Sequence, residues 1–245
     1  MEIGQPFTIL NEVDSTNNYA IRMVQAQMAD HGHCWFAHKQ TAGKGQRSKR
    51  WQSANGENIM MTCAIHPTLL RHSEQFFLTA AVALGCYDFF NSLTNGDTAI
   101  KWPNDIYWRD RKAGGILIES ILRGKTWKYA AVGIGININQ VVFPPEVPNP
   151  VSLRQITGKM HNPVEMSKIL CAFLETRWQQ IVAGEGEHIV LEYNERLYKR
   201  EQQVSFSVEN ATFKAVVKGV NASGDLLLDT GKISNYKHGS LEWMG

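Results

Sequence analysis

Apolar and polar positions change their spacing several times along the chain, and each change marks an expected element. Strand-like runs occupy residues 7–13, 34–39 and 58–65, and the third is almost wholly apolar. Residues 14–28 are predicted to form a helix that begins at capping side chains, and residues 73–93 a longer helix with apolar side chains at helical spacing. These elements predict a sheet with flanking helices.

The middle of the chain continues this mixture of strands and helices. Further strands are expected at residues 99–101, 106–108, 115–122 and 128–138, with a hairpin turn at residues 123–126. A proline-rich loop is expected at residues 143–150, followed by helices at residues 162–183 and 188–198. The fold class predicted for this part is α+β, with a mixed sheet.

The pattern changes after residue 200. Short strands are expected at residues 204–208, 212–220, 225–228 and 232–236, divided by turn signals such as residues 221–224. Several short strands with regular turns indicate a small β-barrel. We therefore divide the chain into a larger domain at residues 1–200 and a small barrel at residues 201–245.

Composition narrows the class of protein. The net charge is only +2, which does not call for a nucleic-acid or membrane partner. The four cysteines, Cys34, Cys63, Cys86 and Cys171, are far apart and lack metal-site spacing, so buried thiols in a reducing compartment are expected. No targeting segment or apolar run of membrane-span length is recognised. A soluble cytoplasmic protein is predicted.

One segment gathers unusual chemistry. Residues 40–51, here called the basic segment, contain two glycines, four cations and Trp51. Glycines allow close approach to a ligand, and the cations suit phosphate or carboxylate. Such a segment is expected to fold over an anionic ligand. A mobile surface loop and a nucleic-acid-binding patch remain alternatives, whereas the glycine spacing excludes a P-loop.

Three further blocks accompany the basic segment. Residues 101–105 are K-W-P-N-D, residues 112–117 fit K-x-x-G-I-L, and residues 133–137 fit G-I-G-x-N. Together with D-S-T-N at residues 14–17, they resemble the biotin–protein ligase family. The resemblance implies a catalytic α+β domain like that of class II synthetases at residues 1–200, followed by an SH3-like barrel. Because the motifs begin by Asp14, it implies the type without an N-terminal DNA-binding domain.

The resemblance also implies an activity. Family members activate biotin with ATP to biotinyl-5′-AMP, with Mg²⁺ expected at the phosphates, and then transfer biotin to a lysine of a biotin carboxyl-carrier domain. The implied partner is that domain of a biotin-dependent carboxylase. No nucleic-acid or membrane partner is expected, and the protein is predicted to be a monomer or homodimer.

The resemblance assigns residues to biotin. Lys112 and Arg47 are the expected catalytic cations, and the expected biotin site comprises Ser15, Thr16, Asn17, Gln40, Gly43, Lys44, Lys112, Gly114 and Gly115. Hydroxyl and amide groups can pair with a ureido ring. Simple helix capping by Ser15 and Thr16 remains an alternative, as does an ordinary solvated lysine in a turn for Lys112.

A second set is expected to bind ATP and the adenylate: Lys44, Gln46, Arg47, Lys49, Trp51, Asn104, Asn137, Gly133 and Gly135. A core role for Trp51 remains open, as does a β-bulge at the two strand glycines. Asp105 is the expected Mg²⁺ or cation partner, with turn capping as its alternative.

The basic segment departs from the family, whose arginines are replaced by Lys44, Gln46 and Lys49. Lysine lacks the bidentate fork of arginine, so weaker retention of the adenylate is expected. A lipoate–protein ligase or octanoyltransferase is the nearest rival. An octanoyl or lipoyl chain, however, needs no ureido partners, so it would leave Ser15, Thr16 and Gln40 unexplained.

Overall fold

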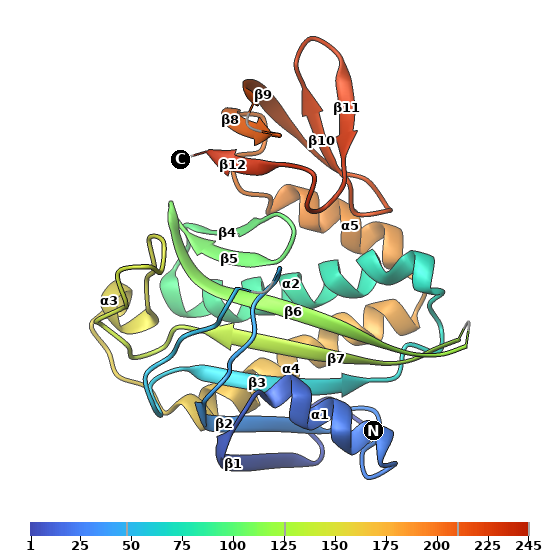
Figure 1. The fold of residues 1–245 in the computed structure, drawn as a ribbon, viewed down its shortest axis with the longest axis vertical. Coiled ribbons are helices and arrows are strands. Elements are labelled where there is room, and N and C mark those ends of the chain that lie inside the picture. Colours follow the sequence, from blue (N-terminus) through green and yellow to red (C-terminus); the bar gives the residue numbers. More distant parts are fainter. Residues whose placement is uncertain (48, 125, 210, 245) are drawn as a thin grey trace.

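The computed structural model describes residues 1–47, 49–124, 126–209 and 211–244, so Ser48 of the basic segment and Lys125 of the expected turn lie outside the described residues. Its larger part is built on a seven-stranded sheet (Figure 1). The strands are β1 (Phe7–Val13), β2 (Cys34–Gln40), β3 (Ile59–Ile65), β4 (Thr98–Lys101), β5 (Asp105–Trp108), β6 (Arg111–Arg123) and β7 (Thr126–Ile136).

The order of these strands is β1-β2-β3-β7-β6-β5-β4. Strands β1 and β2 are parallel, and the other neighbours are antiparallel, which makes the sheet mixed. Every residue of the central strand β3 is buried, because helices and loops cover both faces there. This explains why its sequence is apolar almost throughout.

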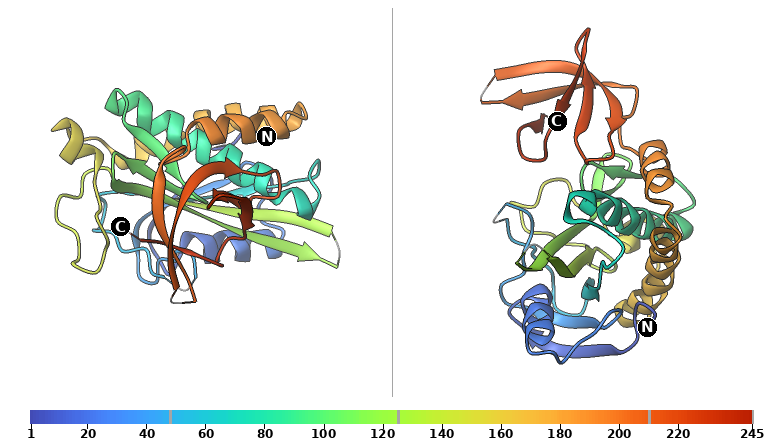
Figure 2. Two further views of the ribbon diagram at one scale, coloured as in Figure 1. Left: turned by 90° about the horizontal axis from the view of Figure 1, so that it is seen from above. Right: turned by 90° about the vertical axis from the view of Figure 1, so that its right-hand side faces the viewer.

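Helices cover both faces of the sheet (Figure 2). Helix α1 (Thr16–Gln25) lies on one face, over a small cluster that includes Ala20 and Trp35. Helices α2 (Gln75–Thr94), α4 (Pro163–Val182) and α5 (Gly186–Glu195) pack on the other face and enclose the main core. The face that carries α1 is called the front face below.

Helix α2 corrects one expectation. With the preceding 3₁₀ turn η1 (His72–Glu74), it is long and apolar enough to cross a membrane by length and composition. Most of the apolar stretch is buried, however, and α2 packs against α4 and α5. Its apolar character is that of a central core helix.

The C-terminal sheet comprises β8 (Gln203–Val208), β9 (Ala211–Val220), β10 (Leu226–Asp229), β11 (Ile233–Tyr236) and β12 (Glu242–Met244). Its order is β11-β10-β9-β8-β12, and all pairs are antiparallel. It sits above the β4–β5 end of the large sheet (Figure 1). The indole Nε1 of Trp102 donates to Gly224 O at 2.9 Å and joins the two parts. The predicted fold class, an α+β sheet followed by an SH3-like barrel, is confirmed.

Some boundaries differ from those predicted. Helix α1 ends at Gln25 rather than near residue 28, because Gln27 adopts a left-handed conformation with φ of 57°. The sequence did not reveal α3 (Leu153–Thr157), a single short helix held by a capping box at Ser152. Strand β12 was also missed, because it is short and its pairing partner β8 is remote in sequence.

Candidate functional site

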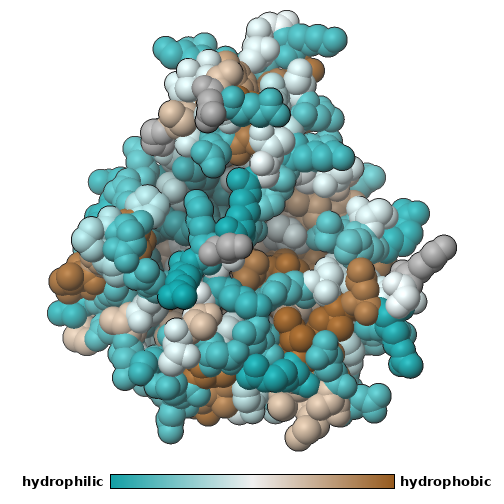
Figure 3. Space-filling model, in the orientation of Figure 1, coloured by the Kyte–Doolittle hydropathy of each residue, from teal (hydrophilic) through white to brown (hydrophobic). Residues whose placement is uncertain are grey.

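A cleft of about 1170 Å³ lies between the front face of the large sheet and the C-terminal sheet. Hydrophilic side chains gather over this hollow in the centre of the surface (Figure 3). The cleft is lined by all the residues expected to form the site except Gly43 and Gly114. Those two glycines are buried and face backbone atoms instead. An added Cβ on Gly43 would lie 2.4 Å from Trp51 O, and one on Gly114 would lie 2.9 Å from Gly135 O.

A polar pocket forms one end of the cleft; it is lined by Thr16, Asn17 and Gln40 and backed by the fully buried Thr62. Gln40 Oε1 accepts from Thr16 N–H at 2.8 Å and lies 3.2 Å from Thr16 Oγ1. Thr62 Oγ1 lies 2.8 Å from Thr16 Oγ1 and 2.6 Å from Asn17 Oδ1. The hydroxyl of Thr62 has one proton, so donation to Asn17 leaves its oxygen to accept from Thr16.

This pocket settles the question of capping. Ser15 occupies the N-cap position of α1, but its side chain makes no capping hydrogen bond. The first helical N–H is instead satisfied by Gln40 from β2. Capping by the side chains of Ser15 and Thr16 is therefore wrong, and both residues are buried where they line the cleft.

The position of Asn17 explains why residue 133 of strand β7 is a glycine. Its Nδ2 donates to Glu119 Oε2 at 2.8 Å, and an added Cβ on Gly133 would lie 2.2 Å from Asn17 Oδ1. Gly133 keeps its place in the ladder, opposite Thr62 and Leu117, so the predicted alternative of a β-bulge is wrong here. The glycine is required because a side chain of the polar pocket packs directly on the strand.

Trp51 and Gly135 repeat this arrangement two residues further along β7. An added Cβ on Gly135 would lie 2.4 Å from Trp51 Cε2, so the indole rests on the glycine backbone. The ladder is regular here too, with Gly135 opposite Met60 and Gly115. Beyond it, buried Asn137 Nδ2 donates to Val151 O at 3.1 Å, which fixes the amide at the end of the cleft.

A β-bulge does occur in β6, where it places the expected catalytic lysine. Ile106 pairs with Gly114 but Tyr107 pairs with Lys112, so Ala113 is an extra residue. The bulge brings Lys112 and Gly115 to the same cleft although they are three positions apart. Lys112 Nζ lies 2.7 Å from Asp105 Oδ2. The alternative of a freely solvated turn lysine is wrong, and so is turn capping for Asp105, which lies in β5 and pairs with this cation.

Most of the described residues of the basic segment line the cleft mouth, and those on either side of the gap at residue 48 pair with each other. Lys44 and Arg50 form an isolated antiparallel β-bridge through their backbones, and Gly45 N–H donates to Lys49 O at 2.7 Å. Lys44 Nζ lies 3.1 Å from Glu119 Oε1. Arg47 has a left-handed φ of 52° and reaches the C-terminal sheet, where an added Cβ on Gly239 would lie 2.8 Å from its Nη2. Arg47 is therefore placed between the two sheets.

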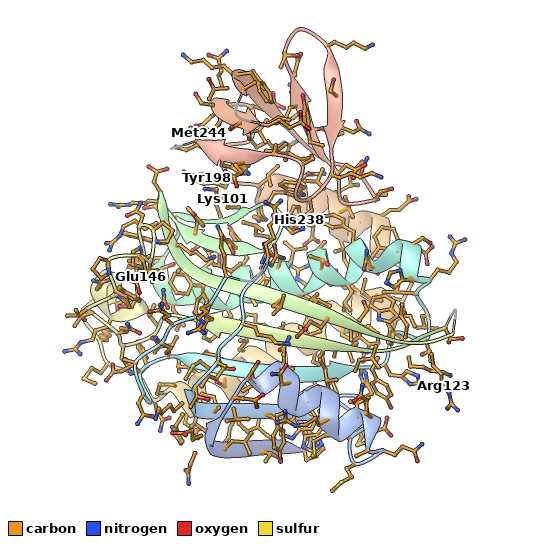
Figure 4. The ribbon with its side chains drawn as sticks, viewed as in Figure 1. Lys101, Arg123, Glu146, Tyr198, His238 and Met244 are labelled. Atoms are coloured by element: carbon orange, nitrogen blue, oxygen red, sulfur yellow. The ribbon has the colours of Figure 1, made fainter. Side chains whose placement is uncertain are left out.

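The opposite rim of the cleft is aromatic and comes partly from the C-terminal sheet. The ammonium of Lys101 lies 4.8 Å from the ring centre of Tyr107 and 5.3 Å from that of Trp243. Lys101, Tyr198, His238 and Met244 surround the space between the two sheets (Figure 4). Burial lowers the pKa of Lys101 and raises the pKa of Tyr107 to about 12. Burial, and then the nearby Arg47, lower the pKa of His238.

The sequence analysis missed several residues that line the cleft or that hydrogen-bond its lining residues. Thr62 had a detectable signal, because it is the single polar residue in the buried strand IMMTCAI. Glu119 follows the K-x-x-G-I-L block at the exposed end of an apolar run, which was a weaker signal. Tyr198, His238 and Trp243 carry no signal, because only the packing of the C-terminal sheet brings them to the cleft.

The cleft offers little for a dedicated protein metal site. Among the described residues, the group of three or more His, Cys, Asp or Glu side chains close enough to share an ion is Cys34, Cys63 and Cys171, outside the cleft. Asp105 is a single carboxylate already paired with Lys112. One carboxylate fits Mg²⁺ only where substrate phosphates and water complete its coordination.

Comparison with known proteins agrees with this geometry. Residues 10–137 match the model of the biotin/lipoate A/B protein ligase family. Over 230 residues the chain is 30% identical to the biotin–[acetyl-CoA-carboxylase] ligase of Paracoccus denitrificans, covering 90% of this chain and 92% of that protein. Over 232 residues it is 29% identical to the bifunctional ligase/repressor BirA of Bacillus spizizenii, covering 93% of this chain and 70% of that protein.

A solved structure shares the fold. The biotin protein ligase from Aquifex aeolicus, in complex with biotin and ATP, matches with a TM-score of 0.82 and 22% identity, covering 97% of this chain and 98% of that one. The family match, the relative of similar length and the shared fold all agree. The chain therefore belongs to the biotin/lipoate A/B protein ligase family, and within it to the biotin–protein ligases.

Proposed function

We propose that this enzyme activates biotin with ATP to biotinyl-5′-AMP and then transfers biotin to a lysine of a biotin carboxyl-carrier domain. One observation carries the proposal: the polar pocket at Gly133 and the indole at Gly135 lie two residues apart on one strand face. That spacing is roughly 7 Å. Two ligands bound there would meet end to end beside Lys112.

The size of the cleft supports two ligands at once. Pockets for one small molecule usually measure about 300–1000 Å³, and this cleft measures about 1170 Å³. We assign the polar pocket to the ureido ring, because it supplies hydroxyl and amide groups for one carbonyl and two N–H groups. A lipoyl or octanoyl chain has no ureido group that could pair with the hydroxyl and amide groups of this pocket, which disfavours the rival substrates.

We assign the adenine ring to Trp51 and Asn137. We assign the phosphates to the cations of the cleft that lie between the polar pocket and Trp51. In the first step a biotin carboxylate oxygen bonds to the α-phosphorus of ATP, and pyrophosphate leaves. Lys112, oriented by Asp105, stabilises the charge that develops on the α-phosphate. Mg²⁺ would arrive with the ATP phosphates, with Asp105 as the carboxylate available to it, and would neutralise their charge.

In the second step the acceptor lysine amine bonds to the biotinyl carbonyl carbon, and AMP leaves. The adenylate must be kept from water between the steps. Arg47 reaches toward Gly239, and residues 44–47 and 49–51 lie at the cleft mouth, in a position to cover it. We propose that residues 1–200 bind both substrates, whereas residues 201–245 complete the cover and the acceptor-facing rim.

The carrier domain of a biotin-dependent carboxylase is the proposed partner, in line with the name of the Paracoccus relative. A cytoplasmic location is proposed for the same reason, since the substrates are ATP and a cytoplasmic carrier. Nucleic acid is not a proposed partner, because the cations line a cleft in which Lys44 and Lys112 already pair with carboxylates.

Biotin-dependent exchange of labelled pyrophosphate into ATP tests the first step, with lipoate and octanoate measured in parallel. Exchange with biotin alone is expected, followed by AMP release and biotin transfer when a carrier domain is added. Exchange with lipoate instead would assign the enzyme to the lipoate branch of the family. Salt-sensitive retention of DNA or RNA, with no exchange for any acid, would favour a nucleic-acid-binding function.

A further inference from the structure

Three of the four cysteines form a cluster behind the cleft. Cys34, Cys63 and Cys171 come from β2, β3 and α4, and their Sγ atoms lie within 4.8 Å of one another. All three side chains belong to the main core, on the face of the sheet opposite Thr62. The proposed ligase reaction uses none of them.

The strands bring two of these sulfurs unusually close. Cys34 lies directly opposite Cys63 in the antiparallel ladder. Ala64 N–H donates to His33 O at 2.9 Å, so the cysteine pair occupies a non-hydrogen-bonded position, where facing side chains approach most closely. Their Sγ atoms are 2.7 Å apart. Cα atoms at such positions are about 4.5 Å apart, within the range that a disulfide accepts.

The distances distinguish a disulfide from a metal site. A metal bound by two thiolates at about 2.3 Å each separates the sulfurs by about 3.8 Å. Cys34 and Cys63 would have to move apart by about 1 Å to hold such an ion. A disulfide needs them to close to about 2.05 Å, which is the smaller change. The surroundings agree, because Ile3, Leu174 and Trp178 make the site apolar, and a disulfide adds no charge there.

Cys171 is placed to react first. It is the most accessible of the three, at 4% exposed, and it is covered by the N-terminal turn at Gly4. Hydrogen bonding with Cys34 and Cys63 lowers the pKa of Cys171 to about 5, whereas burial raises the pKa of both neighbours. Cys171 Sγ lies 3.9 Å from Cys34 Sγ. The thiol with the lowest pKa of the three is therefore next to the facing pair.

We propose that Cys34 and Cys63 are a reversible disulfide site, oxidised by hydrogen peroxide through Cys171. The Cys171 thiolate takes one peroxide oxygen, the O–O bond breaks, and a sulfenic acid and hydroxide form. The Cys34 thiol displaces that oxygen as water and forms a bond to Cys171. The Cys63 thiol then gives its proton to the hydroxide, which becomes the second water, and its sulfur bonds to Cys34 as the Cys171 thiolate leaves. Two thiols and one peroxide give one disulfide and two waters.

The disulfide would act on the polar pocket. Thr62 precedes Cys63 and points to the front face, where it contacts Thr16 and Asn17. Trp35 follows Cys34 and pairs with Thr62 in the ladder. Drawing the two strands together behind the sheet shifts Thr62 in front of it. This coupling to biotin rests on the proposed function, whereas the disulfide does not.

The test uses the reduced 245-residue chain. It is treated with hydrogen peroxide in the folded state, its free thiols are alkylated, and disulfides are mapped by mass spectrometry. We expect a Cys34–Cys63 bond that a reductant reverses. Cys171→Ala should slow its formation at least about tenfold, because the thiolate is lost. Cys86→Ala is the matched control, because Cys86 is also a buried cysteine but lies outside the cluster, and it should leave the rate unchanged.

Biotin affinity is then measured by calorimetry for reduced and oxidised protein. We expect oxidation to weaken it about tenfold, within the usual range for coupled sites. Failure to form the bond in excess peroxide, with the fold intact by circular dichroism, overturns the proposal. Stoichiometric cadmium binding that needs all three cysteines and blocks oxidation replaces it with a metal site. Equal affinities overturn the coupling, whereas no biotin binding by reduced protein contradicts only the proposed function.

Discussion

Lys112 and Asp105 form an ion pair at the floor of the cleft, with Nζ 2.7 Å from Oδ2. The two residues belong to different sequence blocks. They meet because the bulge at Ala113 places Lys112 on the side of β6 that lines the cleft. Both side chains are about one quarter exposed. The pair therefore orients the ammonium while leaving it accessible to an anion.

Lys112→Ala is expected to abolish adenylate formation and leave the fold intact. Removing one donor to a developing negative charge typically costs about 10²–10³ in rate. A partly exposed ion pair contributes at most about 1 kcal/mol to the free energy of unfolding. Pyrophosphate exchange and chemical denaturation measure the two effects. Lys39→Ala is the matched control, because Lys39 also pairs with a carboxylate, Glu12, but lies outside the cleft. Near-normal turnover of Lys112→Ala would refute the assignment.

Thr16→Val should weaken biotin binding at least about tenfold with little change in thermal stability. Valine keeps the shape of threonine but removes the hydroxyl that the ring would contact. Thr62 still donates to Asn17, so no buried donor of the pocket loses its partner. Ser152→Ala provides the contrast, because Ser152 is a true cap of α3. It should lower stability by about 1 kcal/mol and leave biotin affinity unchanged. The reverse pattern would show that Thr16 is structural.

Gly135→Ala should weaken ATP binding by displacing Trp51, because the added methyl would lie 2.4 Å from the indole. In a Trp51→Ala background the methyl meets no indole, so the second substitution should add little. We expect a coupling of at least about 1 kcal/mol in the double-mutant cycle, measured by ATP titration. Gly133→Ala is the control, because its added methyl would clash with Asn17 rather than with Trp51. It should weaken biotin binding, and its effect on ATP binding should be additive with that of Trp51→Ala. Additivity for Gly135 would mean that the indole contact is unimportant.

The stability of the fold should fall as the pH drops below about 6.5. Burial lowers the pKa of His31, His33 and His238 from their ordinary value of 6.5. In the window between that value and the lowered pKa, the unfolded chain binds more protons than the folded one, which destabilises the fold. Denaturant midpoints between pH 7.5 and roughly pH 5.5 measure the slope.

His31→Asn should flatten that slope, because asparagine can still accept the hydrogen bond from His66 N–H without titrating. The same change at exposed His72 controls for loss of an imidazole elsewhere. A slope that is unchanged in His31→Asn would show that this histidine does not contribute to the acid sensitivity.

Much of this protein could be predicted from its sequence. The period of apolar positions located most strands and the long helices, because burial of one face or stripe dictates that spacing locally. The blocks around Thr16, Trp51, Lys112 and Asn137 identified the cleft residues, since close backbone approach and charge restrict residue types. The short elements α3 and β12 were missed because a few residues carry no periodic signal.

Only the tertiary structure decided how these residues meet. The bulge at Ala113 depends on pairing between β5 and β6, so no local sequence pattern predicts it. Gly133 and Gly135 proved to accommodate Asn17 and Trp51, whose approach is set by packing across the sheet. Likewise, the cysteines look isolated in the sequence, but the ladder of β2 and β3 and the position of α4 bring three sulfurs together. Such contacts join residues remote along the chain, and therefore depend on the completed fold rather than on local propensity.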